Sequence, residues 1–122
     1  MAKYNILQEK TFAFAIRIVN LYKYLSEERK EFILSKQIIR SGTSIGANTE
    51  EAIGGQSDKD FLSKLSIAYK EARETMYWLK LLAATNYITQ EQAESILQDA
   101  DEICRILAKI KITSSKKLSL NS

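Results

Sequence analysis

Histidine and proline are absent from the 122 residues of this chain, cysteine occurs once, and glycine occurs four times. Without histidine the chain can form neither a Ser-His nor a Cys-His catalytic pair, and it lacks the usual nitrogen ligand of zinc and di-iron sites. A single cysteine excludes an internal disulfide and a thiolate cluster, which suits a reducing compartment. The residue types therefore indicate no reaction. We expect a protein that is not an enzyme and that holds no metal and no cofactor.

Length and composition are those of one globular domain. Hydrophobic residues make up 45% of the chain and charged residues 27%, which argues against a disordered polypeptide. No apolar run reaches the length of about 18 residues that a membrane crossing needs, and the first residues lack the apolar segment of a signal peptide. These features predict a cytoplasmic protein.

Few residues interrupt regular structure, and apolar side chains recur at helical spacing in four segments. The segments cover about residues 3–25, 27–53, 58–85 and 90–111. The connections between them are short, so consecutive helices should be antiparallel neighbours. The sequence predicts an all-α, antiparallel up-down-up-down four-helix bundle over residues 1–112, followed by a flexible C-terminal tail over residues 113–122.

Polar residues and glycines mark the expected helix ends. In chain order these signals are Ser26 before two glutamates, Gly54-Gly55, Ser57-x-x-Asp60, Asn86 and Thr89-x-x-Gln92. The first predicts the start of the second helix, and the glycine pair predicts its end through a left-handed residue. Ser57-x-x-Asp60 and Thr89-x-x-Gln92 are capping-box patterns that predict the starts of the third and fourth helices. Asn86 predicts the end of the third helix.

The most unusual local sequence contains a G-x-x-x-G pattern, Gly42 and Gly46, inside a predicted helix. Each glycine costs roughly 1 kcal/mol relative to alanine there, so we interpret the pair as a close approach of another helix or subunit. A phosphate-binding loop is the alternative, but the required G-x-x-x-x-G-K-[ST] pattern and a preceding strand are missing. The residues expected at this helix-packing or subunit contact are Ser41, Gly42, Ser44, Gly46 and Asn48, with the two serines and the asparagine bonding across it.

Two helices have more apolar residues than one core requires. The additional positions are Phe12, Ile16 and Val19 in the first helix and Leu62, Tyr69, Met76 and Trp78 in the third. A helix that is apolar on more than one face needs a second partner, which predicts self-association. A wide apolar stripe in a tightly packed monomer is the alternative.

Carboxylates at Glu71 and Glu74 share one face of the third predicted helix. This spacing resembles half of a carboxylate metal site, but no histidine can complete the di-iron pattern. Ion pairs with Arg40, Lys70 or Arg73 explain the same carboxylates more simply. An enzyme built on this chain would have to use such carboxylates with a hard metal ion.

Basic side chains are aligned on one face of the first predicted helix and on one face of the third. The candidate nucleic-acid-binding residues are Lys10, Arg17, Lys59, Lys70, Arg73 and Lys80. Serine and tyrosine are interleaved with them, a mixture that suits phosphate binding and base stacking. An ordinary solvated face is the alternative, because without its last four lysines the chain has 14 basic and 15 acidic groups. Repetition around an oligomer would multiply the basic patch.

Two stretches resemble a known bacterial family. They are residues 34–52, LSKQIIRSGTSIGANTEEA, and residues 57–75, SDKDFLSKLSIAYKEARET. The family is that of the four-helix-bundle proteins of the 23S rRNA intervening sequence, also called the S23 ribosomal protein family, and the similarity extends to about residue 112. Its motif corresponds to Arg40, Ser41, Ser44, Ile45, Ala47, Asn48 and Glu51 of this chain. The resemblance implies that these residues form the helix-packing or subunit contact, which adds Arg40 and Glu51 to the residues expected there.

The resemblance implies an antiparallel four-helix bundle that assembles into a ring-like homopentamer without enzymatic activity. It also implies a relation to the accessory variability proteins of retroelements, whose expected ligands are nucleic acid and a reverse transcriptase. We therefore expect a non-enzymatic oligomer that binds RNA or DNA through the basic faces of helices one and three. The alternative is a protein-interaction scaffold that engages a partner enzyme without nucleic acid, favoured by residues 87–108, which hold one basic and five acidic groups.

Overall fold

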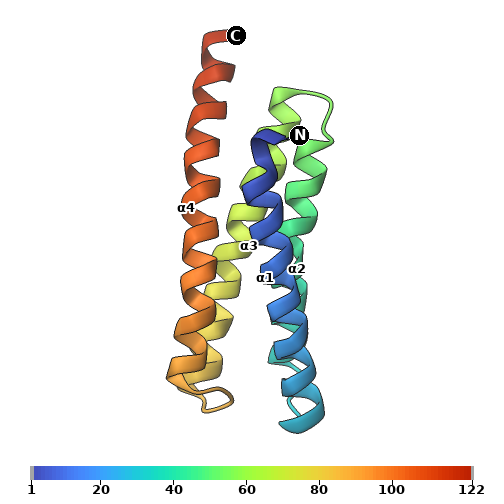
Figure 1. Cartoon of the computed structure of the whole chain (residues 1–122), viewed down its shortest axis with the longest axis vertical. Helices are drawn as coiled ribbons and strands as arrows, with labels where there is room; N and C mark the ends of the chain where they lie inside the picture. Colours follow the sequence, from blue (N-terminus) through green and yellow to red (C-terminus); the bar gives the residue numbers. More distant parts are fainter. Residues whose placement is uncertain (1, 122) are drawn as a thin grey trace.

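Four long helices lie side by side in the computed structural model of the chain, which describes residues 2–121 (Figure 1). The elements are a 3-10 turn η1 (Ala2–Tyr4), α1 (Asn5–Lys23), a π-helical turn η2 (Tyr24–Glu28), α2 (Leu34–Ile53), α3 (Asp58–Ala84) and α4 (Gln90–Asn121). No strand occurs in the described part of the chain. The prediction of an all-α protein with four helices is confirmed.

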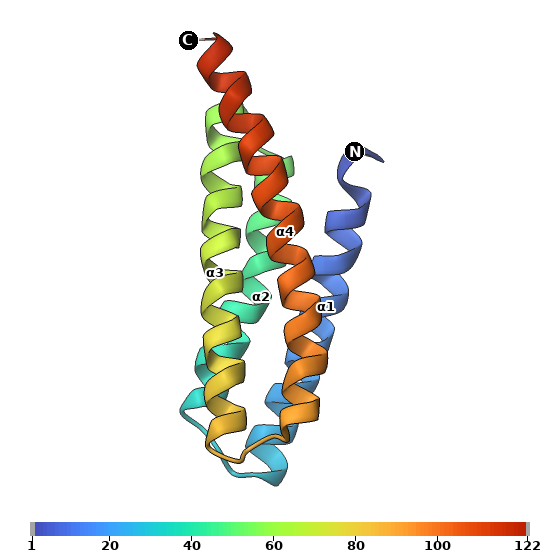
Figure 2. The same cartoon turned by 90° about the vertical axis from the view of Figure 1, so that its left-hand side faces the viewer.

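The three connections between consecutive helices lie at alternating ends of the bundle. The α1–α2 and α3–α4 connections lie at one end, while the α2–α3 connection lies at the other end with both termini (Figures 1 and 2). Successive helices therefore run in opposite directions. Towards the termini α4 extends beyond the other helices and diverges from α1 (Figure 2).

A single core runs between the helices. Its largest fully buried side chains include Phe14, Ile18, Ile38, Ile45, Leu65, Leu79, Leu82, Ile103 and Leu107, and all four helices contribute. Burial of each such side chain stabilises the fold by about 1.5–3 kcal/mol. No helix within residues 2–121 combines the length and the apolar character that a membrane crossing requires.

The start of the second helix differs from the prediction. Helix α2 begins at Leu34, because the chain continues α1 as a π-helical turn through Glu28. Ser26 lies in that turn, where its hydroxyl donates to the carbonyl of Tyr22 at 2.9 Å. Ser26 is therefore not the cap of α2, and the chain reverses later, at Lys30, with a φ of 55°.

Glu31 supplies the cap that the sequence analysis missed. Its carboxylate accepts hydrogen bonds from the backbone N–H groups of Leu34 at 3.0 Å and Ser35 at 2.7 Å, and also from that of Ile33. Burial raises the pKa of the Glu31 carboxyl, but these N–H groups favour the ionised form, and together they leave its pKa below the ordinary value. A carboxylate among the first N–H groups of a helix also interacts favourably with the helix dipole.

The capping predictions for the last two helices are confirmed. Ser57 Oγ accepts from the N–H of Asp60 at 3.0 Å, and Thr89 and Gln92 exchange reciprocal backbone-to-side-chain bonds of 2.8 and 3.0 Å. After α3, Asn86 takes the left-handed conformation with a φ of 68°.

The left-handed glycine predicted at the end of α2 is wrong, because no described glycine has a positive φ. Gly55 instead allows a close approach of backbone and side chain. A Cβ atom there would crowd the carbonyl of Ala52 at 3.0 Å and the carboxylate of Asp60.

The predicted flexible tail over 113–122 also differs, because α4 continues without a break to Asn121, and Ser122 lies outside the described residues. Neither glycine nor proline follows the start of α4, so nothing in the sequence ends the helix earlier. Lys117, in this extension, lies 3.3 Å from the carboxylate of Asp58 at the start of α3.

Candidate functional site

The outer face of α3 presents four basic groups, with serine and tyrosine side chains between them. Lys59, Lys70, Arg73 and Lys80 are all exposed, and we call these four residues the α3 basic strip. They span 21 positions of one helix, which corresponds to about 30 Å. Ion pairs within residues 2–121 involve none of the four. The strip therefore retains its full positive charge.

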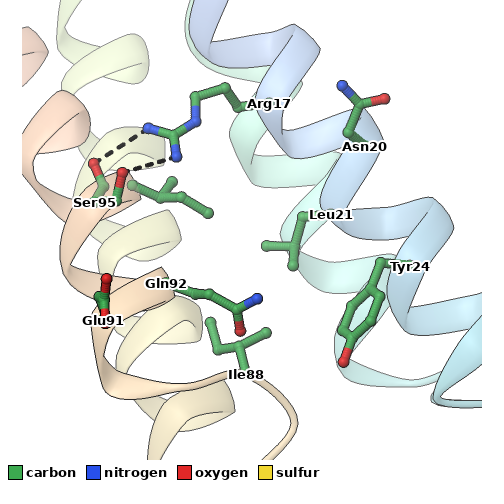
Figure 3. Close-up of a pocket in the computed structure, with 9 residues that line it drawn as sticks. Arg17, Asn20, Leu21, Tyr24, Ile88, Glu91, Gln92 and Ser95 are labelled. Atoms are coloured by element: carbon green, nitrogen blue, oxygen red, sulfur yellow. Dashed lines mark hydrogen bonds between the residues drawn. The ribbon is translucent and has the colours of Figure 1, made fainter.

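The basic residues predicted on the first helix have a different environment. Lys10 Nζ lies 2.9 Å from Glu102, and Arg17 Nη1 lies 2.7 Å from Asp99, so both cations are neutralised by α4. Arg17 also donates to the carbonyl and the hydroxyl of Ser95, at 3.2 and 3.0 Å (Figure 3). The structure thus places Lys10 and Arg17 in the α1–α4 contact, apart from the α3 basic strip.

A groove of about 490 Å³ lies beside this contact, between the end of α1 and the start of α4. Leu21 and Ile88 extend into it from opposite sides, and Tyr24, Asn20 and Gln92 lie around it (Figure 3). The only cation that lines it is the ion-paired Arg17. The groove therefore offers no free positive charge to a phosphate.

Lysines in the last part of α4 extend the positive surface. Lys111 Nζ lies 4.6 Å from the centre of the Tyr69 ring on α3, which places this part of α4 beside the α3 basic strip. Lys109 and Lys116 are exposed, and no acidic residue follows Glu102. The sequence analysis assigned this segment mainly to a tail. Its lack of helix breakers and of acidic residues was the signal that could have included it.

The glycines of α2 lie against α1. A Cβ atom at Gly42 would be 2.7 Å from two carbons of the Ile18 side chain, and one at Gly46 would be 3.5 Å from Thr11. Close approach of these two helices is therefore the reason for the first glycine, since no larger residue fits beside Ile18.

Polar residues around these glycines bond differently from the prediction. Of Ser41, Ser44 and Asn48, Ser41 is the one that bonds to another helix within residues 2–121, through the hydroxyl of Thr75 on α3 at 2.8 Å. Ser44 donates to the carbonyl of Arg40 at 2.6 Å, and Asn48 donates to that of Ser44 at 2.8 Å. The last two side chains therefore satisfy carbonyls of their own helix, as short polar side chains often do.

The carboxylates of α3 belong to a network with α2. Arg40 forms ion pairs with Glu71, at 3.0 Å, and with Glu74, whose carboxylate also accepts from the indole N–H of Trp78 at 2.9 Å. Glu51 of α2 pairs with Lys64 of α3 at 2.9 Å. No group of three or more potential metal ligands occurs within residues 2–121. These carboxylates therefore link two helices within one chain.

The second apolar stripe of α1 is not covered by the other helices. Phe12 is 70% exposed and Ile16 is 49% exposed. Isolated exposed apolar residues are common, but two large ones one turn apart form an unpartnered face. This face and the α3 basic strip are two surface features that the contacts between the helices do not use.

Sequence and structure comparisons place the chain among known proteins. The sequence model described as 23S rRNA-intervening sequence protein matches residues 3–109. The structure is similar to the crystal structure of a Bacteroides thetaiotaomicron protein of unknown function from the S23 ribosomal protein family. The two share 59% sequence identity with a TM-score of 0.88, over 89% of this chain and 97% of that one. No curated protein matches this chain.

Proposed function

Since the chain belongs to the 23S rRNA-intervening sequence protein family, we propose that it is a non-enzymatic cytoplasmic oligomer that binds RNA or DNA. The binding surface is the α3 basic strip with the adjoining lysines of α4. The observation that carries this proposal is the distribution of ion pairs. Lys10 and Arg17 of α1 are neutralised by α4, whereas the four cations of the strip have no carboxylate partner within residues 2–121.

Unpaired cations are the groups that bind phosphates with release of counterions. A strip of about 30 Å covers several phosphates of one strand, at about 3.4 Å per base step in a duplex. Tyr77 lies within the strip and is 59% exposed, so its ring is available to stack on an unpaired base. Charge, length and an aromatic ring thus occur together on one face.

The test compares two double variants, one that lacks two cations of the strip and one that lacks two cations outside it. We expect Lys70→Gln/Arg73→Gln to weaken binding of a fluorescent 20-nucleotide RNA about tenfold at low salt and to reduce the slope of log affinity against log salt by about one to two. Fluorescence anisotropy over a salt series measures both quantities. The matched control is Lys23→Gln/Lys36→Gln, which removes the same charge from exposed positions of α1 and α2.

Two outcomes would contradict the proposal. If the control weakens binding as much as the strip variant, only total charge matters and the strip is not the site. If affinity for RNA and for DNA does not fall as salt rises, phosphate neutralisation is not the mechanism.

Self-association is the second part of the proposal, and a homopentamer is the state that the family resemblance implies. The exposed pair Phe12 and Ile16 supports it, because covering such a face stabilises an assembly. We expect light scattering to give about five times the mass of one chain, and Ile16→Ser to reduce that mass. Ile112→Ser, at an α4 residue that is 59% exposed, is the control. A single-chain mass for the unmodified protein would contradict self-association.

A scaffold that binds a partner enzyme is the second candidate function. The acidic start of α4 favours it, because Glu91 and Glu94 are exposed and form no ion pair within residues 2–121. Capture of a partner that persists after nuclease treatment and is lost in Glu91→Gln/Glu94→Gln would favour the scaffold over nucleic-acid binding.

A further inference from the structure

A second groove, which we call the terminal groove, lies at the end of the bundle that holds both termini. The turn η1, the end of α2, the α2–α3 connection, the start of α3 and the last part of α4 form its walls, and its volume is about 680 Å³. Sites for small organic ligands have volumes of about 300–1,000 Å³. At this end of the bundle α4 diverges from α1 (Figure 2).

Positive charge dominates the terminal groove. Lys3, Lys109 and Lys117 line it together with a single carboxylate, that of Asp58. The carboxylate is 3.3 Å from Lys117, so these two charges offset each other. Lys3 and Lys109 form no ion pair within residues 2–121, and both are exposed. The groove therefore presents two free ammonium groups on opposite walls, one before α1 and one on α4.

Aromatic rings form another part of the lining. Tyr4 and Phe61 lie with their ring centres 5.3 Å apart, and both rings are only partly buried. The ammonium group of Lys3 lies 5.6 Å from the centre of the Tyr4 ring. An aromatic surface beside free cations is the combination that binds a base and its phosphate at the same time.

We propose that the terminal groove binds one nucleotide unit of a strand, with the base against Tyr4 and Phe61 and the phosphate between Lys3 and Lys109. This inference rests on the proposed function, because the same strand continues past the α4 lysines to the α3 basic strip. An acidic peptide would use the two ammonium groups but not the rings. A nucleotide uses both, which is why we favour it.

The test uses the full chain and adenosine 5′-monophosphate as the probe, measured by isothermal titration calorimetry and NMR chemical shifts. We expect saturable binding with shifts at Tyr4, Phe61 and Lys109. Tyr4→Leu removes the ring and should weaken binding about tenfold, the usual effect of losing one base stack. Lys109→Gln, at an exposed position, should weaken it several-fold without affecting folding. Lys23→Gln is the control that leaves binding unchanged.

Two competitors separate a nucleotide from simpler anions. Ribose 5-phosphate lacks the base, and hexaglutamate lacks both base and phosphate. We expect each to bind at least tenfold more weakly than adenosine 5′-monophosphate. Equal binding of ribose 5-phosphate, or displacement of the nucleotide by an equal concentration of hexaglutamate, would overturn the assignment of a nucleotide.

The two proposals fail separately. Binding of the 20-nucleotide RNA without any binding of adenosine 5′-monophosphate would overturn the terminal groove and leave the α3 basic strip supported. Mononucleotide binding that is lost in Tyr4→Leu, with RNA binding that Lys70→Gln/Arg73→Gln does not weaken, would support the groove and overturn the strip.

Discussion

Replacing Gly42 by alanine should destabilise the bundle, although alanine is the better helix former. A Cβ atom at this position would lie 2.7 Å from both Cγ1 and Cγ2 of Ile18. Ile18 is fully buried, and a β-branched side chain in a helix has one strongly preferred rotamer, so it cannot turn away. Alanine gains about 1 kcal/mol in helix propensity, whereas overpacking a core costs about 1–3 kcal/mol. With two carbons in collision, we expect a net loss of about 1–2 kcal/mol.

Gly46 is the matched control on the same helix. The atoms nearest to its added Cβ belong to Thr11 and lie at 3.5 Å, which is ordinary van der Waals contact. Gly46→Ala should therefore keep most of the gain in propensity and stabilise the protein by up to about 1 kcal/mol. The two substitutions are chemically identical, and their expected effects have opposite signs.

Urea denaturation followed by circular dichroism measures both effects. For urea slopes of about 1–3 kcal/mol per molar, the Gly42→Ala midpoint should fall by about 0.3–2 M. All variants are compared at one protein concentration, because assembly makes the midpoint depend on it. Ile18→Ala alone should cost about 2–5 kcal/mol, and it should cost less in the Gly42→Ala background, where it relieves the collision. Equal stability of Gly42→Ala and the unmodified protein would refute the packing argument.

Two further predictions concern buried groups. Glu31→Gln should cost about 1 kcal/mol, because it weakens the cap of α2. The pKa of Glu31 is lowered in the fold, so the stability from its carboxylate is complete above the ordinary value of 4.5 and is lost as the pH falls through the folded pKa. Urea midpoints measured against pH should therefore decrease less on acidification in Glu31→Gln than in the control Glu28→Gln. Burial raises the pKa of the Cys104 thiol, so a thiol reagent should modify it slowly at neutral pH and rapidly in urea, and rapid modification of the folded protein would contradict its burial.

Regular patterns in the sequence predicted most of the fold, whereas the irregular local geometry could not be predicted from it. Helical spacing and the capping boxes of α3 and α4 are local signals, because the residues that form each bond are only three positions apart. The cap of α2 is less regular. Glu31 lies before the helix, and it contacts the first N–H groups of α2 because the chain reverses at Lys30. Lysine is not a residue type that predicts a positive φ, so the sequence does not indicate this reversal. A serine before two glutamates was the more familiar pattern, and it marked the wrong position.

In the candidate site, the sequence also could not show which cations are paired with carboxylates. Lys10 and Arg17 are spaced by one heptad on α1, as regularly as the cations of the α3 basic strip, so spacing alone could not separate the two sets. What separates them is the helix that lies opposite. The acidic part of α4 faces α1 and neutralises both residues, through Glu102 and Asp99. The four cations of the strip form no ion pair within residues 2–121, although Lys80 lines a shallow groove with Glu94 and Asp101 of α4. The acidic helix that argued against nucleic-acid binding in the sequence is thus partly used to hold α1. Twelve lysines and arginines form no ion pair within residues 2–121, and seven of them lie on α3 and the end of α4, a distribution that a net charge counted over the sequence could not show.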